Sequence, residues 1–71
     1  MAESVYKFIE LVGTSTESWE KAAAAAVEMA SKTLRELRIA EVTELDMHIG
    51  NGKVATYRAK VKLSFKVEKV D

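Results

Sequence analysis

The sequence predicts an α+β domain of order β-α-β-β, in which a three-stranded antiparallel sheet wraps around one long helix. A first stretch rich in β-branched and aromatic residues, which favour strands, precedes a glycine. A run of five alanines, which favour a helix, comes next. Two stretches with strand-like alternation then flank a glycine-rich turn. With 71 residues and no proline-rich linker, the chain is expected to form a single domain, residues 1–71.

The first strand is expected over Ser4–Val12, where apolar side chains fall on both faces. Gly13 is expected to end this strand. A helix is then expected from about Glu17 to Leu37, with Thr14, Ser15 or Thr16 as its N-cap. Thr14 and Glu17 have the spacing of a capping box. One apolar stripe follows this helix, with small residues in its middle: Trp19, Ala23, Ala26, Ala30, Leu34 and Leu37.

The remaining chain predicts a long hairpin, with strands over Ile39–Ile49 and Val54–Val67 around the turn Gly50–Lys53. Asn51 and Gly52 suit the positive φ angles of such a turn. The second of these strands alternates strictly, so its apolar face is expected under the helix and its basic face toward solvent or a partner. In the first, one face is expected to hold Ile39, Glu41, Thr43, Leu45, Met47 and Ile49, and the other Ala40, Val42, Glu44, Asp46 and His48.

A single helix covers only one face of a sheet, so the row Leu45, Met47 and Ile49 is expected to be bare in an isolated chain. Domains of this size usually need a disulfide, a metal or partner subunits for stability. The chain has no cysteine and one histidine, His48. Self-association is therefore the expected source of additional burial.

Composition argues against several classes of protein. Eleven basic and eleven acidic residues cancel, whereas a nucleic-acid-binding domain normally has a basic excess. No apolar run has the length of a membrane span, and no signal peptide is apparent, so a cytoplasmic protein is expected. The chain shows no nucleophile–base arrangement and no phosphate-binding glycine loop. We therefore expect a protein that is not an enzyme.

Several segments resemble the dodecin family in order and spacing: Gly13–Ser15, the alanine-rich helix, Ala40–Val42, Thr56-Tyr57 and Ser64–Lys66. The resemblance implies a non-enzymatic binding or storage protein. It also implies assembly as a hollow homododecamer.

The resemblance places the family's flavin-pocket positions at Ile39, Glu44, His48 and Arg58. Flavin-binding members have a stacking tryptophan at the first position and a glutamine at the last. Isoleucine lacks the aromatic face, which is worth ~0.5–1.5 kcal/mol in aromatic pairs. Arginine only donates hydrogen bonds, whereas glutamine donates and accepts. Flavin affinity is therefore expected to be weak or absent.

Other segments are similar to a calcium-binding, flavin-poor branch of the family: Ser18–Glu20, Arg38–Ala40, Asp46-Met47 and Thr56–Arg58. Calcium takes six to eight oxygen ligands, and the chain has no D-x-D-x-D-G loop to supply them. A calcium site is thus expected only at a subunit interface or symmetry axis, with its ligands unassigned. The alternatives are a flavin-binding and flavin-buffering dodecin, or a purely structural shell.

Two features allow more than one interpretation. Trp19 is either a ligand platform or, as we favour, a packing residue of the core or an interface. Glu44, Asp46 and His48 form either a metal-attracting row or a row paired with basic residues across the hairpin. Pairing is favoured because opposite charges commonly face each other between strands.

Overall fold

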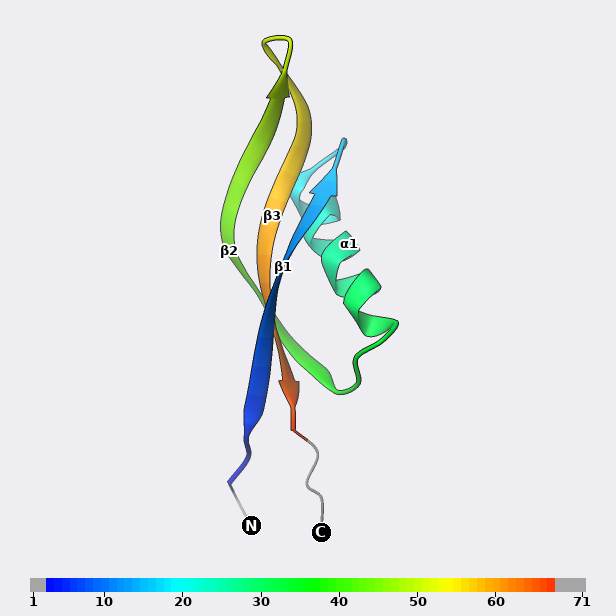
Figure 1. Cartoon of the computed structure of the whole chain (residues 1–71), viewed down its shortest axis with the longest axis vertical. Helices are drawn as coiled ribbons and strands as arrows, with labels where there is room; N and C mark the ends of the chain where they lie inside the picture. The colour runs from blue at the N-terminus through cyan, green and yellow to red at the C-terminus, as the bar shows by residue number, and fades with distance from the viewer. Residues whose placement is uncertain (1–2, 68–71) are drawn as a thin grey trace.

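The computed structural model describes residues 3–67 and shows one sheet with one helix against it (Figure 1). Its elements are β1 (Tyr6–Ser15), α1 (Trp19–Ser31), β2 (Leu37–Gly50) and β3 (Lys53–Lys66). The strand order is β1-β3-β2, and both pairings are antiparallel. The predicted β-α-β-β topology is therefore confirmed. Within residues 3–67, no helix is both long and apolar enough to cross a membrane.

Gly13 lies inside β1 and does not end it, which corrects the predicted strand boundary. It pairs with Ala59 of β3 and is buried under α1. A Cβ atom at this position would lie 1.9 Å from the carbonyl oxygen of Ala22. Glycine is therefore required because the backbone of the helix lies directly on the backbone of the strand.

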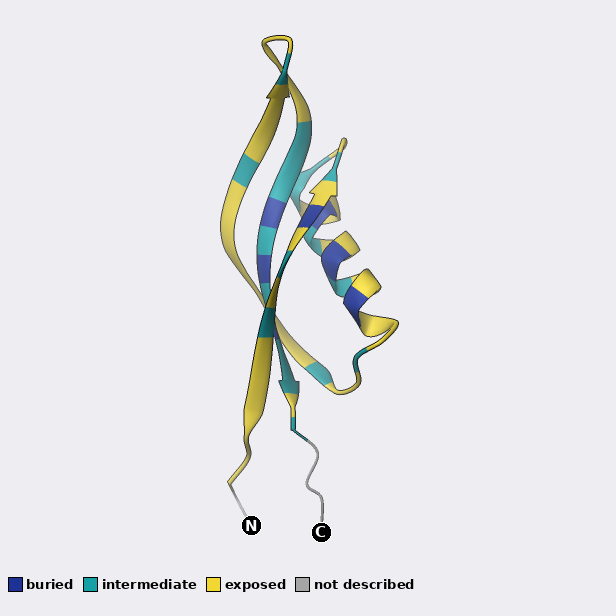
Figure 2. Ribbon diagram, viewed as in Figure 1, coloured by how far each residue is buried: buried dark blue, intermediate teal, exposed yellow. Residues whose placement is uncertain are grey.

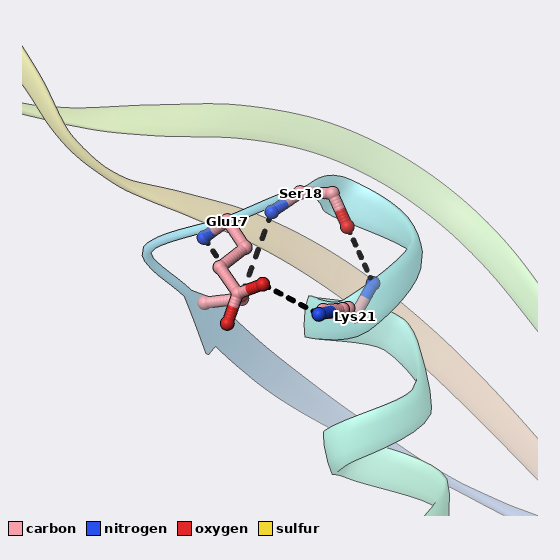
Figure 3. Close-up of polar contacts among 4 residues, drawn as sticks. Glu17, Ser18 and Lys21 are labelled. Carbon is pink, nitrogen blue, oxygen red and sulfur yellow. Dashed lines mark hydrogen bonds and ion pairs between the residues drawn. The ribbon is translucent and has the colours of Figure 1, made fainter.

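The helix begins later than predicted, because β1 continues to Ser15. The N-cap is Ser18, whose Oγ accepts a hydrogen bond from the backbone N–H of Lys21 at 3.0 Å (Figure 3). The expected Thr14–Glu17 capping box is absent from this helix start. Ser15 instead orders the turn, since its Oγ accepts from the backbone N–H of Glu17 at 3.0 Å.

The helix also ends earlier than predicted, at Ser31 rather than Leu37. Glu36 has a φ of 60° just before β2 begins, so the chain turns there into the sheet. Leu34 and Leu37 still pack against the core, from the connection and from β2. Their spacing resembled a helical stripe because they contact the same core as the helix.

The core joins one side of α1 to one face of β3, and Figure 2 shows the buried positions facing each other there. Its buried members are Ala22, Ala26, Ala30, Ala59, Val61 and Leu63. The prediction that the apolar face of β3 lies under the helix is thus confirmed. The alanines let the sheet approach closely, but they leave few large side chains in the core of the isolated chain.

A β-bulge at Thr43 changes which side chains of β2 share a face. The pairing runs Val42 with Val61 and then Glu44 with Lys60, so Thr43 is the extra residue. After the bulge, Leu45 lies opposite the buried Ala59. Since directly opposed residues point to the same side of a sheet, the predicted faces of β2 are correct up to Val42 and reversed from Glu44 to His48.

The apolar row of β2 therefore lies on the helix side of the sheet, and not on the opposite face as predicted. It stays uncovered because α1 packs mainly over β1 and β3. Leu45 is 52% exposed and Met47 43% exposed. The expectation that this row is bare in a single chain is confirmed, with a different cause.

Candidate functional site

The four predicted pocket positions lie on the sheet face turned away from α1, which we call the outer face. Ile39 pairs with Ser64, Glu44 with Lys60, His48 with Thr56, and Arg58 with Asp46. The β3 members of these pairs alternate along the strand with the buried residues Ala59, Val61 and Leu63, so they point to the outer face.

Three of these positions come together in one chain, and one does not. Asp46, the partner of Arg58, lies between Glu44 and His48 on the same face of β2. Ile39 lies opposite Ser64, six residues along β3 from Arg58. At ~3.4 Å per residue, this is a separation of about 20 Å. A pocket that uses both Ile39 and Arg58 therefore needs residues from more than one chain.

The Arg58 side chain forms a two-pronged ion pair with Asp46. Its Nε donates to Oδ1 at 2.8 Å and its Nη2 donates to Oδ2 at 3.1 Å. These hydrogen bonds hold the pKa of the Asp46 carboxyl below its ordinary value, and they raise the pKa of Arg58. Both planar groups are thus committed to each other in the described chain.

The next pair along the hairpin is Glu44 with Lys60, at 2.7 Å between Oε1 and Nζ. The hydrogen bond that Lys60 donates to the Glu44 carboxylate raises the pKa of Lys60. Beyond it, Glu41 and Glu10 flank Lys62 in the register of the sheet. The interpretation of this row as paired charges is confirmed for Glu44 and Asp46, whereas His48 lies opposite Thr56. Residues 3–67 contain no group of three or more His, Asp or Glu side chains that could hold a metal ion.

Apolar side chains accompany these charges at the other end of the outer face. Ile39 is 60% exposed, and Tyr6 and Phe8 of β1 are also exposed, while the exposed Val12 lies beside Lys60. The Lys62 ammonium lies 4.7 Å from the centre of the Phe8 ring, a cation–π distance. This exposed apolar area matches the property expected of a subunit interface.

Trp19 packs on the helix side, as favoured from the sequence. Its ring meets that of Tyr57 edge to face, with 5.1 Å between centroids and 69° between planes. Its Nε1 donates to the main-chain carbonyl of Asp46 at 3.0 Å. The sequence did not indicate that this contact reaches the residue that pairs with Arg58.

An open groove of about 240 Å³ lies at the C-terminal end of β3, away from Arg58. It is lined by Lys7, Arg35, Phe65, Lys66 and Val67. Sequence reasoning missed this basic groove, because its residues come from β1, the α1–β2 connection and the end of β3.

The family model for dodecin matches residues 5–68 of the chain. The chain belongs to the dodecin family. One related dodecin, the calcium dodecin of Mycobacterium tuberculosis (strain ATCC 25618 / H37Rv), is 47% identical over 64 residues, which span 90% of each protein.

Solved dodecin structures share this fold. Dodecin from Streptomyces coelicolor superposes with a TM-score of 0.91 at 38% identity, over 99% of this chain and 100% of that one. The calcium dodecin of Mycobacterium tuberculosis, whose crystal structure is described as having a novel calcium-binding site, superposes with a TM-score of 0.82 at 44% identity. That match covers 96% of this chain and 97% of the other.

Proposed function

We propose that this dodecin is a non-enzymatic, homododecameric binding protein that binds calcium or a similar cation between subunits and has little or no affinity for flavin. The observation that carries the proposal is the Arg58–Asp46 ion pair at a family pocket position. Glutamine at that position would offer a ligand both a donor and an acceptor, whereas Arg58 has no acceptor and directs two of its donors to Asp46.

The case against tight flavin binding rests on two positions. Ile39 offers an exposed aliphatic surface and no ring for stacking. Trp19 does not substitute for the missing ring, because it is packed on Tyr57 on the helix side. A flavin in this pocket would therefore lose both the aromatic contact and the hydrogen bonds to its ring edge.

The case for a cation rests on the calcium dodecin relative and on the acidic residues of the outer face. Glu10 and Glu41 lie on either side of Lys62 there. Because calcium needs six to eight oxygen ligands, and residues 3–67 of one chain gather no suitable cluster, several chains have to contribute. Symmetry-related copies would repeat the same carboxylates around an axis.

The case for assembly rests on surface that one chain leaves uncovered. Leu45 and Met47 are exposed beside α1, while Phe8 and Ile39 are exposed on the outer face. Exposed rows on both faces of one small sheet are typical of a subunit that is buried on both sides by its neighbours.

Calorimetric titration of the assembled protein with calcium, with magnesium as the comparison, tests the cation part. We expect saturable calcium binding, with fewer sites than chains if the ligands meet at an axis. A parallel titration with riboflavin, followed by flavin fluorescence, tests the claim that flavin affinity is weak or absent. Strong quenching at micromolar riboflavin would contradict the claim of weak flavin affinity. If neither cation gives heat in the calorimeter, a purely structural shell is favoured.

A further inference from the structure

We propose that Asp46 determines which ligands the outer face accepts: by holding the Arg58 guanidinium, it excludes phosphate-bearing ligands. The inference rests on the proposed function only in taking this part of the outer face as a ligand site. The two prongs of Arg58 that bind Asp46, Nε and Nη2, form one of the two edges of the guanidinium that can bind two phosphate oxygens, and the Asp46 charge repels an anion at the other.

The residue that carries this carboxylate, Asp46, is contacted from both sides of the sheet. The backbone carbonyl of Asp46 accepts the indole N–H of Trp19 on the helix side, while its side chain meets Arg58 on the outer face. Asp46 is thus positioned by α1, and a competing anion has to displace a carboxylate whose backbone is held by the Trp19 hydrogen bond. This arrangement makes Asp46 a built-in occupant of an arginine anion site.

The surrounding charges strengthen the exclusion. The neighbouring cation, Lys60, is already paired with Glu44. An incoming phosphate would therefore meet two carboxylates and no uncommitted cation at these two cross-strand pairs. Within a single chain the Arg58 and Asp46 side chains are 41% and 45% exposed, so the chain itself does not shield the guanidinium from a small anion once the carboxylate is removed.

The experiment uses inorganic phosphate as the probe and the ³¹P linewidth as the readout, because phosphate bound to the protein tumbles slowly. We expect Asp46→Asn to tighten phosphate binding by roughly three- to tenfold at low salt, in line with a charge-assisted contact at an exposed site. The double variant Asp46→Asn with Arg58→Gln is expected to lose this gain. The matched control is Glu44→Gln, which removes the same charge from the next pair and frees a lysine without a planar fork.

Unchanged phosphate affinity in Asp46→Asn would overturn the proposal, as would an equal gain in Glu44→Gln, which would indicate a general charge effect. Asp46→Ala serves as the second variant, and native mass spectrometry follows assembly in each. Loss of assembly in both Asp46 variants would also overturn it, because the carboxylate would then be structural. The readout involves neither calcium nor flavin, so the proposed function can fail while this inference holds.

Discussion

The indole N–H of Trp19 donates a 3.0 Å hydrogen bond to the main-chain carbonyl of Asp46. Trp19 is the first residue of α1, and Asp46 lies in the middle of β2. The start of the helix is therefore attached to the strand that α1 otherwise covers least. Because the Asp46 side chain binds Arg58 on the far side of the sheet, one residue joins the helix packing to the outer face.

Trp19→Phe should weaken this attachment while keeping the aromatic contact with Tyr57. We expect a loss of about 0.5–1.5 kcal/mol in the free energy of unfolding, the net value of one hydrogen bond. Denaturant unfolding followed by circular dichroism is the measurement, because Trp19 is the only tryptophan. Wild-type stability in this variant would show that the bond contributes nothing.

Gly13→Ala should separate α1 from β1, since the added Cβ would lie 1.9 Å from the Ala22 carbonyl oxygen. Backbone atoms cannot rotate away, so we expect a loss of about 3 kcal/mol or more, at the upper end of overpacking costs. Gly50→Ala is the matched control, because its nearest neighbour, the Ala55 Cβ, would be at an ordinary 3.7 Å. Equal stability of the two variants in thermal unfolding would contradict the close contact.

Much of this fold could be predicted from local pattern. The strict alternation of β3 predicted its buried face, and Asn51-Gly52 predicted the tight turn, where both residues have positive φ. The alanine run predicted the close helix–sheet approach. These features depend on residues near one another in the chain.

The errors arose where tertiary contacts changed a local pattern. The bulge at Thr43 places Leu45 and Met47 on the helix side. Its only signal in the sequence was that Val42 and Leu45 are three residues apart, which breaks the alternation of apolar residues expected in a regular strand. Leu34 continued the helical spacing although it lies past the helix end. The ligand positions could be named only from family resemblance, and the 20 Å between Ile39 and Arg58 required the register of the sheet.

Acidification should break the Asp46–Arg58 pair only at low pH. The pKa of Asp46 lies below its ordinary value of 3.8 because of hydrogen bonds from Arg58. A lowered carboxyl pKa contributes stability above the unfolded value, and this contribution is lost as the pH falls through the folded value. Carboxyl ¹³C NMR should give an Asp46 midpoint below 3.8, and Arg58→Gln should raise it. An unmoved midpoint would rule out Arg58 as the cause.

Leu45→Glu should prevent assembly, because it places a charge in the apolar row beside α1 that another chain is expected to bury. We expect the assembled species to be replaced by smaller ones in size-exclusion chromatography. Ala24→Glu is the control, since Ala24 lies on the exposed side of α1 and glutamate favours helices. Intact assembly of Leu45→Glu would show that this row is not an interface.

Sedimentation velocity of the wild-type protein at dilute concentration tests most directly whether identical neighbours complete this fold. The sheet has exposed apolar rows on both faces, and its core is largely alanine, with one valine and one leucine. We expect a single species with twelve times the 7.9 kDa mass of one chain, and no folded monomer. A stable, folded species of 7.9 kDa would contradict both the assembly and the shared sites proposed from it.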